Sequence, residues 1–208
     1  MRDQKVCEDE KKIARNNKMP FPLLTPEALA QITIGEIQTS KKGQRYAEVK
    51  SDGQQPIWQL SREALCSPWQ AGVFQKDSTV ETRQNLDLHC TEELLETLDQ
   101  MDEFFEKELK KIMPKAQYHK LVQRDEGFPA RIRLKCNAIG STACRFWKAD
   151  KTPLGDIRTI RTAGVQMIPC VCFTKAWSMG TMCGITCEAR VCVITEEIGN
   201  SAADVFPL

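Results

Sequence analysis

The chain has 208 residues, of which 41% are hydrophobic and 27% are charged, and these values exclude a chain that is disordered throughout. Residues 1–18 are rich in charge and no run approaches the roughly 18 apolar residues of a membrane span, so we expect neither secretion nor a membrane partner. The ten cysteines are then expected to stay reduced, in a cytoplasmic or nuclear location.

Both ends of the chain are predicted to be tails. Residues 1–19 contain many charges and almost nothing to bury, which predicts a disordered N-terminal tail, and residues 198–208 are predicted to be a flexible C-terminal tail. Residues 20–197 then form a single domain. It contains N-terminal strands, a helix over residues 91–113 and a basic β half over residues 128–194.

The first part of the domain is predicted to be rich in strands. Thr25 precedes Pro26, which suits the first position of a short helical turn. Alternating residues between turn signals predict short strands near Gln31–Gln38, Arg45–Lys50, Pro56–Leu60 and Glu81–Leu88. Trp58 and Trp69 are expected to pack in the core or at its edge.

An amphipathic helix follows these strands. Thr91 can cap its N-terminus, and Pro114 ends it. Apolar residues recur at helical spacing along one face, at Leu94, Leu98, Met101, Phe105 and Ile112. We expect this face to pack against a sheet; the alternative is a helix that binds a partner or a second copy of the chain as a coiled coil.

The basic half is predicted to consist of strands. Apolar residues alternate with cations in Ala130–Asn137, and a second strand covers Cys144–Lys148. After a loop over Asp150–Gly155, a short strand is predicted over Ile157–Arg161.

The end of the chain predicts a long hairpin around which the fold is organised. Its strands are Ile168–Phe173 and Ile185–Ile194. One face of the second strand carries Ile185, Cys187, Ala189, Val191 and Val193. The tip between the two strands holds Lys175, Trp177, Met179, Gly180 and Gly184.

Positive charge is concentrated in the basic half. Between Phe128 and Val193 there are ten basic and three acidic residues, a local charge of +7, whereas residues 91–127 are acidic in balance. Cations that neutralise phosphates, beside aromatic rings that stack on unpaired bases, are what single-stranded nucleic acid needs. The alternative is a solvated sheet face with its tryptophans in the core. The candidate nucleic-acid-binding residues are Arg131, Arg133, Lys135, Arg145, Trp147, Lys148, Arg158, Arg161, Lys175 and Trp177.

Metal binding and catalysis have little support in the sequence. Several cysteines cluster near the C-terminus, but no Cys-x₂-Cys pair occurs and both histidines lie far from them in sequence. The chain contains no phosphate-binding glycine loop, nucleophile elbow or His-Glu-x-x-His helix. We therefore expect no metal, no cofactor, no catalytic residue and no enzymatic activity. A zinc or thiol protein is a weaker alternative.

The hairpin sequence AWSMGTMCGITCEARVCVI resembles that of a known viral family. It is similar to the tryptophan, glycine and Gly-Val-Thr-type strand of small single-stranded-DNA-binding proteins of nucleocytoplasmic large DNA viruses, the group that includes phycodnaviruses and African swine fever virus. The segments ETRQNLDL, EELLETLDQMDEFF and ARIRLKC occur upstream in a similar order, so the resemblance covers roughly Glu81–Ile194. Trp177, Gly180 and Gly184 match by position, and the many cysteines are a departure.

The resemblance implies an OB-like barrel that binds single-stranded DNA without strong sequence preference. It also implies a role in viral DNA replication, recombination or repair, at the replication site in the host cell. The residue pattern agrees, because the strands cluster instead of alternating with helices. The expected fold class is α+β, mainly β, with an OB-like antiparallel β-barrel and an inserted amphipathic helix. RNA, replication proteins and a second copy of the chain stay open as further partners.

Overall fold

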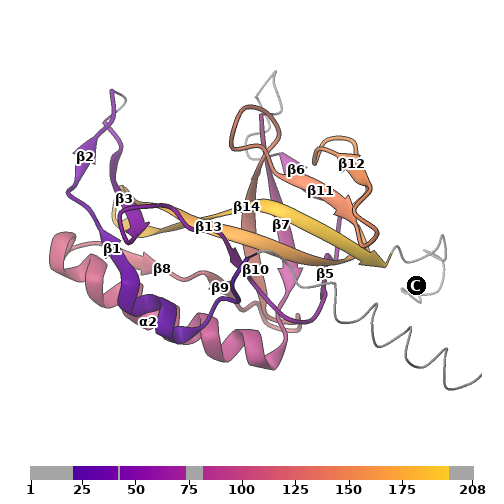
Figure 1. Cartoon of the computed structure of the whole chain (residues 1–208). Helices are drawn as coiled ribbons and strands as arrows, with labels where there is room; N and C mark the ends of the chain where they lie inside the picture. The colour runs from indigo at the N-terminus through magenta and orange to yellow at the C-terminus, as the bar shows by residue number, and fades with distance from the viewer. Residues whose placement is uncertain (1–20, 42, 74–81, 197–208) are drawn as a thin grey trace, which may run out of the picture.

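The structure, a computed structural model, describes residues 21–41, 43–73 and 82–196 (Figure 1). The predicted tails, residues 1–19 and 198–208, lie outside the described residues. In the described part of the chain, no helix is long and apolar enough to cross a membrane.

The described chain consists of one long α-helix, a short 3-10 helix and many strands. The α-helix, α2, covers Glu92–Ile112, and the 3-10 helix, η1, covers Pro26–Gln31. The strands before α2 are β1 (Ile32–Ile34), β2 (Gln38–Thr39), β3 (Arg45–Ser51), β4 (Trp58–Gln59), β5 (Leu65–Cys66), β6 (Gly72–Val73) and β7 (Arg83–His89). The strands after α2 are β8 (Gln117–His119), β9 (Val122–Gln123), β10 (Arg131–Asn137), β11 (Arg145–Lys148), β12 (Pro153–Gly155), β13 (Gln166–Met179) and β14 (Met182–Glu196).

The hairpin of β13 and β14 forms the centre of the sheet, and other strands attach along both of its edges (Figure 1). β3, β4 and β5 pair antiparallel with β13. β8, β10 and β11 pair in parallel with successive parts of β14. The main path across the sheet is β1-β3-β13-β14-β10-β7-β6, so the prediction that the hairpin organises the fold is confirmed.

The hairpin is longer than predicted, and its turn is shorter than the predicted tip. β13 continues to Met179 and β14 begins at Met182, so the turn consists of Gly180 and Thr181. Gly180 has φ 60°, a conformation that glycine adopts without strain.

The paired strands include four residues predicted for the tip, namely Lys175, Trp177, Met179 and Gly184. Lys175 pairs with Thr186, and Trp177 pairs with Gly184. Gly184 suggests a turn in the sequence, but in the structure it makes room for an indole. A Cβ at this position would lie 2.7 Å from Cζ2 of Trp177.

The alternation predicted for β14 is interrupted at Arg190. Val171 pairs with Ala189 while Cys170 pairs with Val191, so Arg190 is an extra residue that forms a β-bulge. The bulge shifts the alternation by one residue. The buried side chains of β14 are Cys183, Ile185, Cys187 and Ala189 before the bulge, and Cys192 and Ile194 after it. The prediction that Val191 and Val193 share a face with Ile185 is therefore wrong.

Helix α2 packs its apolar face against the sheet, as predicted. Thr91 caps it, since its side-chain oxygen accepts a hydrogen bond from the Leu94 N–H at 3.3 Å. Phe105 lies edge-on to Phe173 of β13, with ring centroids 5.4 Å apart. The buried helix residues are Leu94, Leu98, Met101, Asp102, Phe105 and Leu109. The surface that a coiled-coil partner would need is thus inside the chain's own core.

The predicted fold class, α+β and mainly β with an inserted helix, is confirmed. Strands contain 44% of the described residues, compared with about 20–25% in typical proteins. The sheet does not close, however. β1 and β6 end the path across it, and no pairing between described strands joins them, so the described strands form an open sheet instead of a complete barrel.

Two local predictions in the basic half are wrong. Ile157–Arg161 is a turn, because the Asp156 carbonyl accepts the Thr159 N–H at 3.1 Å and the Asp156 carboxylate accepts the Arg158 N–H at 2.9 Å. The loop predicted over Asp150–Gly155 contains β12, which pairs with β11.

Candidate nucleic-acid interface

The register of the strands defines a polar face of the sheet, which we call the outer face. On β10, the fully buried Ile132 and Leu134 belong to the same core as α2, and they alternate with Arg131, Arg133 and Lys135. Neighbouring residues on paired strands share a face. The outer face is therefore lined by these three cations together with Tyr46, Asp87, Lys175, Trp177, Thr186 and Glu188.

The predicted ladder of cations on β10 is present, but two of its members are paired with carboxylates. Arg131 Nη1 lies 2.5 Å from Asp125, and Arg133 forms a bidentate pair with Asp87 at 2.8 and 3.0 Å. Lys135 is half-buried, and burial, followed by two neighbouring arginines, lowers its pKa to about 8. Because Asp87 and Asp125 come from outside the basic half, the ladder carries less free positive charge than the sequence indicates.

A second group of predicted residues lies on β11, along the last part of β14. Arg145 and Lys148 are exposed and Trp147 is half-buried. Arg145 pairs with Val191, and Trp147 pairs with Val193. Within the described residues, neither cation of this group forms an ion pair, so both are available to an anion.

Arg158 and Arg161 lie on the turn between β12 and β13, not on a strand. Arg158 holds the Asp156 carboxylate through two nitrogens at 3.0 and 2.7 Å. This hydrogen bonding lowers the pKa of Asp156 to about 2. The structure therefore does not place these two arginines on the outer-face ladder.

Lys175 and Trp177 join an aromatic cluster at one end of the outer face. Trp177 pairs with Tyr46 on one side and with Gly184 on the other. Lys175 Nζ lies 5.0 Å from the centre of the Tyr46 ring, within the range of a cation–π contact. The His119 ring lies 6.2 Å from the Trp177 ring, tilted by 51°. Aromatic rings and cations thus meet on the half-exposed side of the hairpin.

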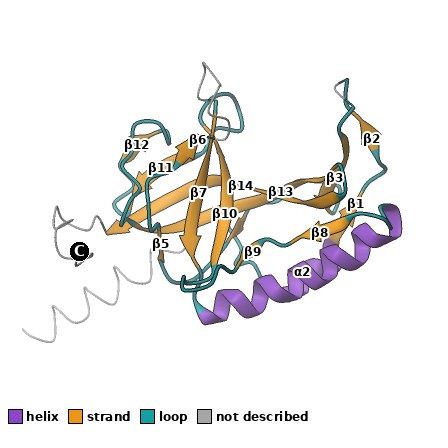
Figure 2. Ribbon diagram, turned by 180° about the vertical axis from the view of Figure 1, so that it is seen from behind, coloured by secondary structure: helices purple, strands orange, loops and turns teal. Residues whose placement is uncertain are grey.

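An open cavity adjoins this cluster where β10 and β14 diverge. β8 pairs with β14, and β9 pairs with β10 (Figure 2). The segment that joins β8 to β9 therefore crosses the fork between β14 and β10. The cavity has a volume of about 390 Å³ and is lined by His119, Lys120, Val122, Gln123, Arg124, Asp125 and Arg133. It extends from the aromatic cluster to the cation ladder.

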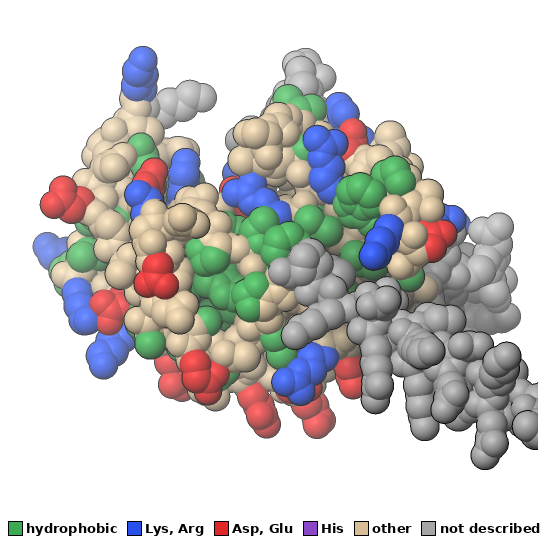
Figure 3. All heavy atoms as spheres, in the orientation of Figure 1, with side chains coloured by type: hydrophobic (Ala, Val, Ile, Leu, Met, Phe, Trp, Pro, Cys, Tyr) green, Lys and Arg blue, Asp and Glu red, His purple; other side chains and the backbone are tan. Residues whose placement is uncertain are grey.

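The two signs of charge are unevenly distributed over the surface. In Figure 3, acidic side chains gather along the lower edge, over α2, with a few basic side chains beside them, and other basic side chains are spread over the upper half. This arrangement follows the acidic helix and basic strands of the sequence. Such a field directs an anionic ligand toward the sheet and away from the helix.

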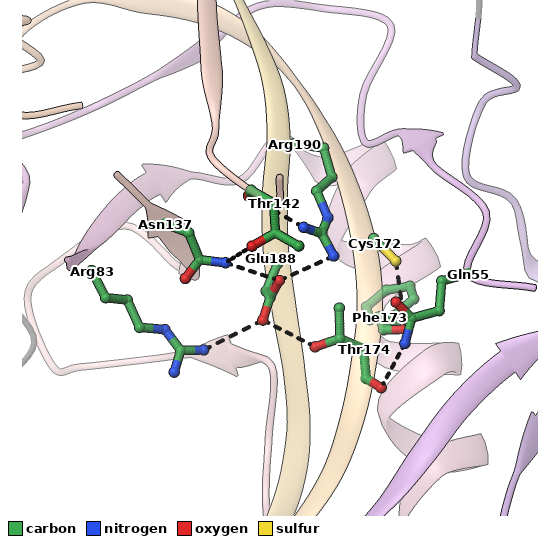
Figure 4. A network of polar contacts seen from close by, with 9 residues as sticks. All are labelled: Gln55, Arg83, Asn137, Thr142, Cys172, Phe173, Thr174, Glu188 and Arg190. Carbon is green, nitrogen blue, oxygen red and sulfur yellow. Dashed lines mark hydrogen bonds and ion pairs between the residues drawn. The ribbon is translucent and has the colours of Figure 1, made fainter. Parts of the chain in front are cut away.

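A polar network lies between the ladder and the hairpin (Figure 4). Its centre is Glu188 of β14, whose carboxylate lies 3.6 Å from Arg83 and 3.2 Å from Arg190. The same carboxylate accepts hydrogen bonds from Asn137 at 3.3 Å and from Thr174 at 3.2 Å. One carboxylate thereby holds side chains from β7, β10, β13 and β14 in fixed positions.

The cysteines are mainly packing residues. Sγ of Cys144 lies 3.9 Å from Sγ of Cys192, and no disulfide is present among the described cysteines. Burial raises the pKa of Cys187 well above its ordinary value, and that of Cys170 to about 12. In the described part of the chain, no group of three or more His, Cys, Asp and Glu residues is placed to hold a metal ion.

Several residues of this surface are not among those predicted from the sequence. Tyr46 could have been found, because it stands on the polar side of an alternating strand. His119 and Lys120 could not be recognised as site residues from the sequence, because only the fork between β10 and β14 places them beside Trp177 and Arg133. The predicted site residues themselves are brought together only in part: the ladder, the β11 group and the aromatic cluster occupy different segments along β14.

Comparisons with known proteins give weak similarities only. No protein-family model and no curated protein sequence matches the chain, so the resemblance to the viral family stays a prediction. Among solved structures, gp2.5, a single-stranded DNA binding protein encoded by bacteriophage T7, has a TM-score of 0.46 at 9% identity, over 73% of this chain and 98% of that chain. The single-stranded DNA-binding protein of bacteriophage Enc34 in complex with ssDNA has a TM-score of 0.47 at 10% identity, over 79% and 96%. Similarities at this level do not assign a function.

Proposed function

We propose that the protein binds single-stranded DNA on its outer face, without strong sequence preference and without catalysing a reaction. The observation that carries this proposal is the open cavity at the fork of β10 and β14. Its lining includes Lys120, Arg124 and Arg133 together with Asp125, and it also includes His119, whose ring lies 6.2 Å from that of Trp177.

The chemistry of the cavity suits an unpaired strand better than a duplex. Lysine and arginine neutralise phosphates and release counterions, and they do so for any sequence. Ring faces stack on bases, at about 1–3 kcal/mol per base, only when those bases are unpaired. A surface that offers both groups side by side favours single strands, and it needs no hydrogen-bond code for particular bases.

The proposed interface revises the residues expected from the sequence. Arg133, Lys175 and Trp177 adjoin the cavity or the aromatic cluster, and they remain central to it. Arg145 and Lys148 are proposed to extend the path along β14, since both are exposed without an ion pair among the described residues. Arg158 and Arg161 are proposed to contribute less, because they lie on the β12–β13 turn. A role in viral replication, recombination or repair rests on the sequence resemblance alone.

The test is a fluorescence anisotropy titration of labelled oligothymidylate between about 50 and 200 mM salt. The logarithm of the affinity should fall linearly with the logarithm of the salt concentration, and a duplex of equal length should bind more weakly. Lys120→Glu should weaken binding and reduce the salt slope by about one. RNA of the same sequence is the parallel ligand that measures the preference for DNA.

The matched control is Lys111→Glu, which makes the same charge change at an exposed position of α2. It should leave the affinity within about twofold, because α2 lies outside the proposed interface. Absence of binding by the unmodified protein at low salt would overturn the proposed function. Equal effects of the two variants would move the interface away from the cavity.

A further inference from the structure

We propose that Trp69 is a second platform on which an unpaired nucleobase stacks, at the end of the cavity opposite to Trp177. This inference rests on the proposed function and adds a position that the sequence assigns to packing. Trp69 is 40% exposed, although the sequence predicts a tryptophan at the core or its edge. Trp58, by contrast, is buried as predicted.

The Trp69 indole is held in a fixed orientation on the outer face. Its Nε1 donates a hydrogen bond to Oδ2 of Asp87 at 3.0 Å. Asp87 is buried and also holds Arg133, so one carboxylate orients both the indole and a cation of the ladder. The guanidinium of Arg131 lies 5.5 Å from the centre of the Trp69 ring, at the distance of a cation–π contact.

Hydrogen bonds within the loop and to the segment before β13 also hold the loop that carries Trp69. The Trp69 carbonyl accepts the Ser67 hydroxyl at 2.9 Å, and the Thr162 hydroxyl accepts the Ala71 N–H at 2.7 Å. Gln70 donates to the Ile160 carbonyl at 3.0 Å. An exposed indole on a mobile loop would lose conformational freedom when it binds, whereas this indole has already lost it.

The neighbours of Trp69 indicate which ligand suits it. Arg133 lines the cavity, and so does Asp125, the ion-pair partner of Arg131. A strand that leaves Trp177 through the cavity therefore reaches the ladder beside Trp69. The two indoles lie on opposite sides of the fork, Trp177 on β13 and Trp69 against Asp87 of β7, with β14 and β10 between them. This separation suits a ligand of several nucleotides instead of a single one.

The first readout is direct observation of the indole in the unmodified protein. The chain has four tryptophans, and incorporation of 5-fluorotryptophan gives each of them a ¹⁹F resonance that tryptophan-to-phenylalanine variants assign. Saturating oligothymidylate should shift the resonance of Trp69 and that of Trp177 and leave the buried Trp58 nearly unchanged. A two-nucleotide ligand should not shift both Trp69 and Trp177, because it cannot span the distance between them.

The second readout is affinity. Trp69→Ala should weaken oligothymidylate binding by about 5- to 160-fold, and Trp69→Phe should restore most of the loss because its ring still stacks. Ile139→Ala, which removes an exposed apolar side chain of the loop after β10, is the matched control and should bind as the unmodified protein does. Circular dichroism and thermal unfolding separate loss of stacking from loss of fold.

The outcomes distinguish the inference from the proposed function. If oligothymidylate binds but the Trp69 resonance stays fixed at saturation, the platform is wrong and DNA binding stands. If Trp69→Phe binds as weakly as Trp69→Ala while both variants are folded, the indole acts through its hydrogen bond to Asp87 and not by stacking, which also overturns the inference. If the unmodified protein does not bind single strands at all, both proposals fall.

Discussion

The hydroxyl of Tyr118 donates a hydrogen bond to Oδ1 of Asp102 at 2.8 Å, and this contact ties the cavity to the helix. Asp102 is a buried residue of α2, and Tyr118 is the central residue of β8. The same carboxylate accepts the N–H groups of Leu121 at 2.8 Å and Val122 at 3.4 Å. The segment from β8 to β9, which crosses the fork and lines the cavity, is therefore positioned by one side chain of α2.

Replacement of Asp102 should weaken both stability and DNA binding. Asp102→Ala leaves two buried N–H groups and a buried hydroxyl without their acceptor, which should lower the free energy of unfolding by about 3 kcal/mol. The affinity for oligothymidylate should fall as well, because His119 and Lys120 lose their fixed positions. Urea denaturation and anisotropy measure the two effects.

The control for this variant is Asp99→Ala on the same helix. Nη2 of Arg124 donates to both carboxylate oxygens of Asp99, at 2.9 and 2.7 Å, but both side chains are largely exposed. Loss of an exposed pair costs at most about 1 kcal/mol. If both variants are equally unstable, the special role of the buried carboxylate is disproved.

Asp102 should also leave a signature in the pH dependence of stability. Burial raises its pKa above the ordinary value of 3.8, so the folded state holds this proton more tightly than the unfolded state. The contribution of the group to stability is complete below pH 3.8 and is lost as the pH rises through the folded-state pKa. Asp156 contributes in the opposite direction, because its pKa is lowered.

The measurement is the free energy of unfolding of the unmodified protein minus that of Asp102→Asn, from urea denaturation across this pH range. Asparagine cannot titrate, so the subtraction removes the contributions of the other carboxylates. The difference should decrease as the pH rises from about 4. A difference that increases with pH would mean that the hydrogen bonds to the carboxylate outweigh its burial.

Much of the fold could be predicted because the periodicity of its elements is regular. The apolar face of α2, the cap at Thr91 and the alternation of β10 each follow from local spacing. The bulge at Arg190 could not be predicted, since it depends on which residues of β13 stand opposite. The turn after Asp156 depends on a side chain that bonds its own backbone, and this competes with the apparent strand pattern.

The candidate site was predicted only in part, because charge in the sequence does not reveal its partners. Arg131 and Arg133 count as free cations in the sequence, and the fold pairs them with Asp125 and Asp87. In the sequence, Trp69 looks like a core residue. In the fold, its Nε1 donates a hydrogen bond to Asp87 of β7, which lies opposite Arg133 of β10. Such contacts are long-range in sequence, and only the folded sheet creates them.

Gly184→Ala should displace the indole of Trp177, and its Cβ would also lie 3.2 Å from the backbone oxygen of His119. The added Cβ would lie 2.7 Å from Cζ2 of Trp177, closer than Cβ atoms approach in real structures, and 3.0 Å from Cε2, which is also tight. Overpacking of this kind costs about 1–3 kcal/mol, and the ring has solvent into which it can move. Oligothymidylate binding should weaken, and the ¹⁹F resonance of Trp177 should shift before any ligand is added.

Gly72→Ala is the matched control for this substitution. Gly72 also lies in a strand, and a Cβ there meets nothing within 4 Å. Stability and affinity should stay close to those of the unmodified protein. If Gly184→Ala moves the Trp177 resonance and leaves the affinity unchanged, Trp177 is a packing residue and must be removed from the proposed interface.

Lys135 should make DNA binding depend on pH near 8. Burial, and then the charges of Arg83 and Arg133, lower the pKa of Lys135 to about 8, so the side chain loses its charge as the pH rises through this value. A bound phosphate would favour the charged form and raise the pKa, and the complex should therefore take up protons between about pH 7.5 and 9. Affinity should fall over the same interval.

Calorimetric titration with oligothymidylate, in buffers with different ionisation enthalpies, measures this proton uptake. The unmodified protein should take up a fraction of a proton per site near pH 8, and Lys135→Arg should take up less, because arginine stays charged throughout. Since Lys135→Arg also keeps the positive charge, its affinity should be nearly independent of pH over this range. Equal proton uptake by the two proteins would show that another group titrates, and it would remove Lys135 from the phosphate contacts of the outer face.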